Sequence, residues 1–82
     1  MLTVRYFASA RAATGVPEEK VPAEDAPTLG ALRTTLASGH GERLAAILTM
    51  ASFLVDGVSC RTDDYALPAD AVVDVLPPFA GG

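Results

Sequence analysis

The sequence contains one cysteine, Cys60, one histidine, His40, and no tryptophan. A single cysteine cannot form an internal disulfide, and without a second cysteine or a histidine cluster there is no basis for a tetrahedral metal site. We therefore expect a reducing compartment, and we expect the chain itself to bind neither a metal nor another cofactor. Cys60 falls in a predicted strand with nothing nearby to activate its thiol, which indicates a passive, partly buried side chain.

Positive charge is also scarce, with six Lys and Arg against ten Asp and Glu and a net charge of −4. Because affinity for nucleic acid comes mainly from clustered basic side chains, we expect no nucleic-acid partner. The negative net charge fits a partner protein with a basic surface better. The most apolar run, residues 44–55, is interrupted by Thr49 and Ser52 and is shorter than the roughly 20 residues of a membrane span. The first residues lack a basic and apolar leader, so we expect a cytoplasmic protein with no membrane partner.

No cluster of catalytic side chains is apparent. His40 lies between two glycines, which indicates a solvated loop histidine. The adjacent pairs Glu18-Glu19 and Asp63-Asp64 point apart on extended backbone, which is typical of solvated charge rather than of an acid–base pair. The glycines form neither a dinucleotide-binding nor a phosphate-binding motif. The side chains therefore indicate no catalytic site.

The segments that are present alternate between strand and helix patterns. In residues 2–8 every second side chain, Leu2, Val4 and Tyr6, is large and apolar, which is the period of a strand with one buried face. Residues 18–22 predict a short, charged strand that forms a hairpin with the first. Between them, residues 9–15 predict a turn or a short helical piece that ends at Gly15.

The clearest helix is predicted over residues 27–41. Thr28 behind Pro27 is a suitable N-cap, and glycines 39 and 41 are expected to end the helix. Its apolar stripe consists of Leu29, Leu32 and Leu36.

A shorter helix is predicted over residues 42–50. Residues 52–60 then fit two strands joined by a turn at Asp56-Gly57, and a bulged turn fits equally well. After a loop at 65–71, residues 71–78 predict a last strand that ends at two prolines. An antiparallel hairpin, a crossing helix and a last strand returning beside the first predict an α+β fold, with one main helix across one face of a mixed sheet and a single domain spanning residues 1–82.

The other face of this sheet is predicted to be uncovered. The period-2 pattern places Arg5, Phe7, Leu54 and Leu76 on it. Large apolar groups that face water together indicate a partner-binding site on a domain of this size. The alternative is a register error of one residue, which would move one or two of them into the core.

The chain ends in the sequence PPFAGG. Pro77 and Pro78 are expected to stiffen the exit from the last strand, while residues 78–82 form a flexible tail. Without Cβ atoms, Gly81 and Gly82 can thread a narrow channel. A terminal carboxylate joined to AMP can be attacked by sulfur or nitrogen, so Gly82 is the one position where we expect chemistry, and Phe79 is a candidate anchor beside it.

Several motifs along the whole chain match one family. The opening VRYFASAR, the helix start PTLGAL, the segment LVDG and the ending VLPPFAGG resemble the small, sulfur-carrier subunit of molybdopterin synthase. That subunit belongs to the ubiquitin-like β-grasp proteins, which also include the thiamine sulfur carrier, so the resemblance implies a β-grasp fold. Arg5, where the family often has an apolar residue, and Asp74 depart from the pattern.

The resemblance implies a cycle with three partners. A ubiquitin-activating-type adenylyltransferase would adenylate Gly82 with ATP and Mg²⁺, and a sulfur donor such as a cysteine desulfurase or a rhodanese would convert it to a thiocarboxylate. The large catalytic subunit of molybdopterin synthase, in an assembly of two copies of each subunit, would then pass the sulfur to a pyranopterin precursor.

The resemblance implies a non-catalytic carrier subunit rather than an enzyme, in which Gly82 bears the sulfur and Gly81 is its small neighbour. The residues expected to contact partners are Phe7, Leu54, Leu76, Phe79 and Ala80. The same ending also fits carriers for thiamine, cysteine or tRNA thiolation and a ubiquitin-like protein modifier. A plain interaction domain that uses the sheet face without the tail is a third possibility.

Overall fold

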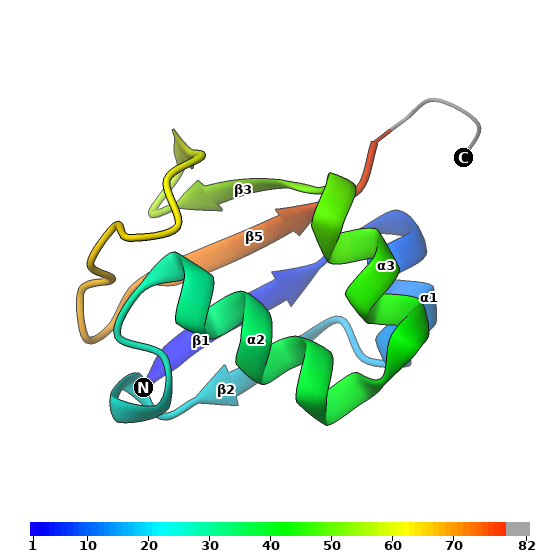
Figure 1. Ribbon diagram of the computed structural model, residues 1–82, viewed down its shortest axis with the longest axis horizontal. Helices are drawn as coiled ribbons and strands as arrows, with labels where there is room; N and C mark the ends of the chain where they lie inside the picture. The colour runs from blue at the N-terminus through cyan, green and yellow to red at the C-terminus, as the bar shows by residue number, and fades with distance from the viewer. Residues whose placement is uncertain (79–82) are drawn as a thin grey trace.

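The computed structural model of the protein describes residues 1–78 and consists of one sheet with helices packed on one face (Figure 1). The strands are β1 (Leu2–Tyr6), β2 (Glu18–Val21), β3 (Ser52–Val55), β4 (Val58–Cys60) and β5 (Val72–Leu76), in the spatial order β2-β1-β5-β3-β4. The helices are α1 (Ala8–Thr14), α2 (Leu29–His40) and α3 (Glu42–Met50), with a 3₁₀ turn, η1, at Ala23–Asp25. The predicted two-layer α+β architecture with a mixed sheet is confirmed.

Strands β1 and β5 run parallel at the centre of the sheet, and the other pairs are antiparallel. Tyr6 lies opposite Val75, so both central strands end at the same end of the sheet. Strand β3 begins at that end, with Ser52 opposite Leu76. The described chain therefore leaves the sheet, through Pro77 and Pro78, from a place where three strands meet.

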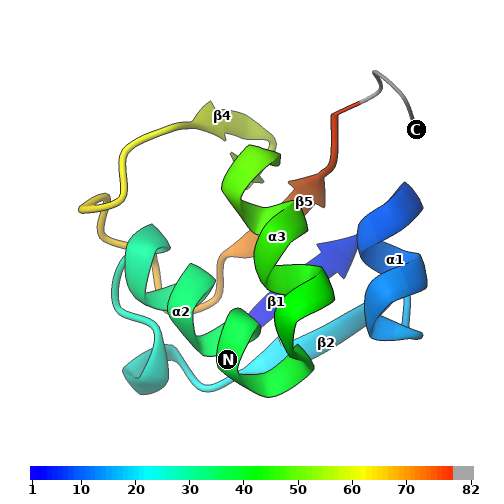
Figure 2. The same cartoon turned by 45° about the vertical axis from the view of Figure 1, so that its right-hand side comes forward.

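The core lies between the sheet and helices α2 and α3, which Figure 2 shows on one face. The inward residues of the sheet alternate with outward ones, and their side chains are almost completely excluded from solvent. The apolar ones are Leu2, Val4, Tyr6, Val21, Phe53, Val55, Val73 and Val75. The helices contribute Leu29, Leu32, Leu36, Leu44 and Leu48. Burial of this apolar surface is the main favourable term in the folding of such a domain.

Helix α2 begins where the sequence predicts. The Thr28 hydroxyl oxygen accepts a hydrogen bond from the Ala31 N–H at 3.1 Å, which satisfies one of the free donors of the first turn. The expectation that Gly39 helps to end the helix is wrong, because α2 continues to His40. Gly41, with a φ of 89°, ends it, and the Gly41 N–H donates to the Ala37 carbonyl at 3.0 Å.

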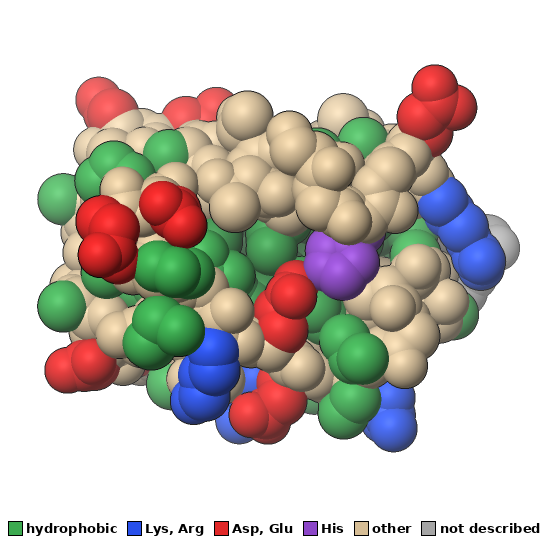
Figure 3. Space-filling view, turned by 90° about the horizontal axis from the view of Figure 1, so that it is seen from below, with side chains coloured by type: hydrophobic (Ala, Val, Ile, Leu, Met, Phe, Trp, Pro, Cys, Tyr) green, Lys and Arg blue, Asp and Glu red, His purple; other side chains and the backbone are tan. Residues whose placement is uncertain are grey.

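His40 is not the solvated loop residue that its glycine neighbours indicate. Its side chain is only 20% exposed, and its Nε2 lies 2.6 Å from Glu19 Oε1 on the edge strand β2. The buried Tyr6 hydroxyl donates to the same carboxylate, and the Tyr6 and His40 rings meet edge to face with centroids 5.8 Å apart. Glu19, expected to be a solvated charge, therefore joins β1, β2 and the end of α2. Figure 3 shows the histidine, in purple, in a hollow, and a groove of about 270 Å³ between β2 and α2 runs past it.

The turn regions resolve two open alternatives. Residues 8–14 are helical, and Gly15 ends α1 with a φ of 78°. Residues 52–60 form a hairpin, because Asp56 and Gly57 both take positive φ values of 50° and 83° between β3 and β4. Cys60 in β4 is partly buried, as predicted.

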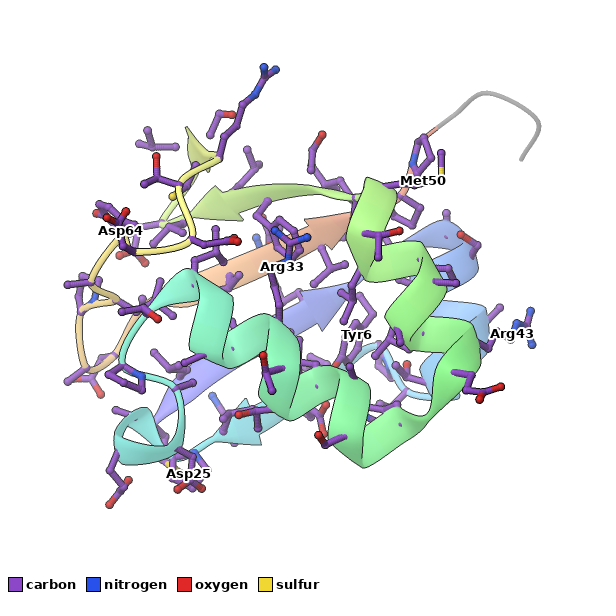
Figure 4. The ribbon with its side chains drawn as sticks, viewed as in Figure 1. Tyr6, Asp25, Arg33, Arg43, Met50 and Asp64 are labelled. Carbon is purple, nitrogen blue, oxygen red and sulfur yellow. The ribbon has the colours of Figure 1, made fainter. Side chains whose placement is uncertain are left out.

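The long loop before β5 is held against helix α2. The Gly30 N–H donates to the Asp63 carbonyl at 2.8 Å, and a Cβ added at Gly30 would lie 3.0 Å from Asp63 Cβ. Arg33, which Figure 4 labels, donates from Nη1 to Asp63 Oδ1 at 2.8 Å and lies over the Phe53 ring at 5.4 Å. A side chain at position 30 would crowd Asp63, because the loop packs directly on the helix backbone.

Within residues 1–78, no helix is both long enough and apolar enough to cross a membrane.

Candidate partner-binding surface

The face of the sheet opposite α2 and α3 is formed by the outward residues of the strands. The central row runs across the sheet through Glu18, Arg5, Asp74, Leu54 and Ser59, each opposite the next in register. This face therefore carries charged groups at its middle as well as the apolar groups that the sequence predicts.

Arg5 and Asp74 form a bidentate pair between the parallel strands β1 and β5. Arg5 Nε lies 2.5 Å from Asp74 Oδ1, and Arg5 Nη2 lies 2.9 Å from Asp74 Oδ2. The Asp74 side chain is 8% exposed, whereas that of Arg5 is 47% exposed. The hydrogen bond and the negative charge of Asp74 raise the pKa of the Arg5 guanidinium. The two departures from the family pattern thus compensate each other, because the arginine neutralises a carboxylate that is largely removed from water.

The three predicted partner-contact residues within the described range lie around this pair. Leu54 is opposite Asp74 across β3 and β5, and Leu76 is two residues further along β5. Both are partly buried, and neither belongs to the buried core. Phe7 is 41% exposed and follows β1 as the extended N-cap residue of α1. The alternative, in which a register error of one residue moves one or two of them into the core, is therefore wrong. The apolar surface is nevertheless small, because two of its three side chains are partly buried and the charged pair lies between them.

Four predicted site residues, Phe79, Ala80, Gly81 and Gly82, lie outside the described residues. Their assignment stays a prediction, as does the expected flexibility of the tail beyond Pro78. Among residues 1–78, no three His, Cys, Asp or Glu side chains are grouped so that they could hold a metal ion.

Met50 is one of several exposed apolar residues that the sequence does not predict. Met50 is 70% exposed at the end of α3. Figure 4 labels it at the end of α3, on the side of the sheet that the helices cover, and it stands two residues before Ser52, which pairs with Leu76. Met50 lies two residues before β3, and β3 pairs with the last strand, β5. The sequence shows the first of these facts, but the pairing is known only from the strand order.

The architecture is that of ubiquitin-like β-grasp proteins. SAMP1 from Haloferax volcanii superposes with a TM-score of 0.81 at 19% identity, covering 99% of this chain and 98% of that chain. A putative molybdopterin converting factor subunit 1 from Pyrococcus furiosus superposes with a TM-score of 0.77 at 28% identity, covering 94% and 95%. Subunits 1 and 2 of the molybdopterin-converting factor from Helicobacter pylori were solved as a complex, in which the matching chain gives a TM-score of 0.71 at 22% identity, covering 99% and 97%.

The comparison of the sequence with family models assigns the chain to a family. The sequence model of the ThiS family matches residues 4–82, so the chain belongs to the ThiS family of small sulfur-carrier and ubiquitin-like proteins. No curated protein matches the sequence significantly. The family resemblance and the β-grasp fold expected from the sequence are both confirmed.

Proposed function

We propose that this chain is a sulfur carrier for molybdenum cofactor biosynthesis and that its Gly82 carboxylate becomes the thiocarboxylate. The observation that carries the proposal is the family match, which extends through the two terminal glycines to residue 82. The 28% identity to the putative molybdopterin converting factor subunit from P. furiosus supports this pathway over the others.

The chain acts in this proposal as a reagent rather than as a catalyst. An oxygen of the Gly82 carboxylate attacks the α-phosphorus of ATP on the activating enzyme, and pyrophosphate leaves. The resulting acyl adenylate is a mixed anhydride, so the outer sulfur of a persulfide on the donor can attack its carbonyl carbon and release AMP. A thiol then attacks the inner sulfur of the acyl disulfide, which leaves the thiocarboxylate on Gly82 and a disulfide on the donor. All groups that activate ATP, bind Mg²⁺ and deliver sulfur belong to the partners.

The described surface supplies docking rather than chemistry. Ordering a tail costs on the order of 1–2 kcal/mol of backbone entropy per residue, so binding energy has to come from elsewhere. The open face offers Phe7, Leu54 and Leu76 for this purpose, and Phe79 and Ala80 would add contacts inside the partner's channel. The H. pylori complex of subunits 1 and 2 supports a large subunit as one such partner.

The test follows the terminus by intact mass. The chain is incubated with ATP, Mg²⁺, the activating enzyme and a sulfur donor, and we expect one carboxylate oxygen to be replaced by sulfur. Deletion of Gly82, or addition of one alanine after it, should abolish the mass change while the fold is retained. Gly39→Ala is the control, since its Cβ would meet nothing within 4 Å. Unimpaired loading of either tail variant would contradict the proposal.

The receiving pathway needs a second step. Loaded chain is mixed with the large subunit of molybdopterin synthase and the pyranopterin precursor, and we expect the sulfur to move to the pterin. A loaded chain that transfers sulfur only in thiamine, cysteine or tRNA thiolation assays would keep the carrier role but change the pathway. Isopeptide conjugates to lysines in cell lysates would instead indicate a protein modifier.

A further inference from the structure

Exposed apolar side chains surround the point where the chain leaves the sheet. We call Phe7, Met50, Leu76 and Pro78 the tail-root surface. Phe7 and Met50 are 41% and 70% exposed, and they rank among the large apolar residues that the described chain leaves to solvent. Leu76 is partly buried and Pro78 is exposed.

The strand order places these residues on opposite sides of the exit. Tyr6 pairs with Val75 and points into the core, so the next residue, Phe7, whose backbone is still extended, is directed toward the open face. Ser52 pairs with Leu76 from the other side, and Met50 stands two residues before it at the end of α3. Figures 1 and 2, which differ by a rotation of 45°, both show the end of α3 close to the tip of β5. The apolar surface therefore continues from the open face around the exit to the helix side.

The covalent geometry of the chain limits how far away a partner can be. Four residues follow Pro78, and an extended chain spans at most about 3.6 Å per residue, so Gly82 can reach no further than roughly 14 Å from Pro78. Part of this length is used inside the partner, because a site that adenylates a carboxylate lies below the enzyme's surface. The rim of that site must consequently approach the tail root closely, and a rim that surrounds the tail would cover side chains on both sides of the exit.

We propose that the activating enzyme seats an apolar rim on the tail-root surface and that Met50, on the helix side, is a docking residue. This inference rests on the proposed function. It extends the footprint beyond the open face and does not depend on whether the activated chain later becomes a carrier or a modifier, because both require adenylation. Burial of an exposed methionine in such a rim would favour the complex through the hydrophobic effect.

The chain offers a matched control for this residue. Val58 is 69% exposed, almost the same as Met50, but it lies in the edge strand β4, which β3 and β5 separate from β1, and next to the β3–β4 turn. Substitution of either residue by serine removes an exposed apolar group without changing the net charge. The two variants therefore separate a local contact from a general effect of surface polarity.

The measurement is the Kd of the full-length chain for the activating enzyme by isothermal titration calorimetry. We expect Met50→Ser to weaken the Kd about tenfold, Val58→Ser to change it less than about twofold, and Met50→Leu to keep it within about twofold of the wild type. Circular dichroism and thermal unfolding verify that each variant is folded. Wild-type affinity of Met50→Ser, or an equal loss in Val58→Ser, would overturn the inference.

Adenylation assays distinguish this failure from that of the proposed function. If the wild-type chain is adenylated and Met50→Ser is adenylated with the same KM, the docking role is wrong and the carrier function stands. If the wild-type chain is not adenylated at all, the proposed function fails as well. A docking role predicts a raised KM with an unchanged kcat.

Discussion

The two faces of the sheet are built by the same strands and differ in almost every other respect. The face under α2 and α3 carries side chains such as Val4, Val73 and Val75, none of which has any exposed surface. The open face carries the Arg5–Asp74 pair at its centre and partly buried leucines beside it. Alternation along each strand thus separates two tasks, because one set of side chains holds the domain together and the other set is left for partners.

The polar pair on the open face is a compromise between these tasks. A fully apolar open face would be an aggregation hazard for the free protein, whereas an unpaired buried carboxylate would destabilise it. The bidentate contact satisfies Asp74 while the leucines remain within reach of a partner. The difference between the faces predicts that stability responds mainly to substitutions on the covered face.

The largest effect is expected at Val73. Val73→Ala removes two methyl groups from a fully buried site and should reduce the free energy of unfolding by about 2–3 kcal/mol in urea titrations. Its neighbour Val72 lies on the open face of the same strand and is partly exposed. Val72→Ala should therefore reduce the free energy of unfolding by about 1 kcal/mol or less. Equal losses of stability in the two variants would contradict the expected difference between the covered and the open face.

The attachment of the helix layer is tested at Gly30. Gly30→Ala places a Cβ 3.0 Å from Asp63 Cβ and 3.1 Å from its carbonyl oxygen, so the loop must move. Gly39→Ala, in the same helix but in open space, should gain up to about 1 kcal/mol from helix propensity. We expect the free energy of unfolding of Gly30→Ala to be about 1–2 kcal/mol below that of Gly39→Ala. The order of the two variants in urea unfolding checks the contact.

The stability of the domain at alkaline pH is expected to depend on Tyr6, a residue of the covered face. Burial, followed by the hydrogen bond to Glu19 and the charge of Glu19, raises the pKa of Tyr6 above its ordinary value of 10.0. Below that value the hydroxyl is neutral in both states, and above it only the unfolded chain releases the proton. The free energy of unfolding should therefore fall by up to about 1.4 kcal/mol per pH unit as the pH rises above about 10.

Comparison with Tyr6→Phe isolates this contribution. At neutral pH the free energy of unfolding of Tyr6→Phe should be about 1 kcal/mol below that of the wild type, because the hydrogen bond to Glu19 is lost. In alkaline solution it should fall less steeply than that of the wild type. Tyr65→Phe, at a residue that is 44% exposed, serves as the control and should follow the wild-type curve. Parallel curves for the wild type and Tyr6→Phe would show that Tyr6 ionisation is not responsible.

The smallest effect is expected at the edge of the open face. Lys20 Nζ donates to Thr3 Oγ1 at 2.6 Å in an exposed position. Because both groups are readily hydrated without each other, Lys20→Ala should change the free energy of unfolding by no more than about 0.5 kcal/mol. A loss above 1 kcal/mol in the same urea titrations would show that the open face contributes more to stability than its exposure indicates.

Local patterns predicted the elements well and failed where neighbours in space decide. Thr28, the leucine stripe and the alternation in β1 act within a few residues, so their consequences were visible in the sequence. The glycines that flank His40 are typical of a loop, whereas its hydrogen bond is to Glu19, 21 residues away along the chain. The Arg5–Asp74 pair spans 69 residues and depends on the parallel pairing of β1 with β5.

The sequence by itself determined the period of each strand, the apolar stripe of α2, the family and the terminal glycines at which chemistry is proposed. These properties follow from local spacing and residue type. Only the tertiary structure decided that Arg5 neutralises Asp74, that Tyr6, Glu19 and His40 form one cluster, and that Met50 stands beside the exit of the last strand. Each of these contacts requires a particular strand order and register, which arise from the packing of the whole chain.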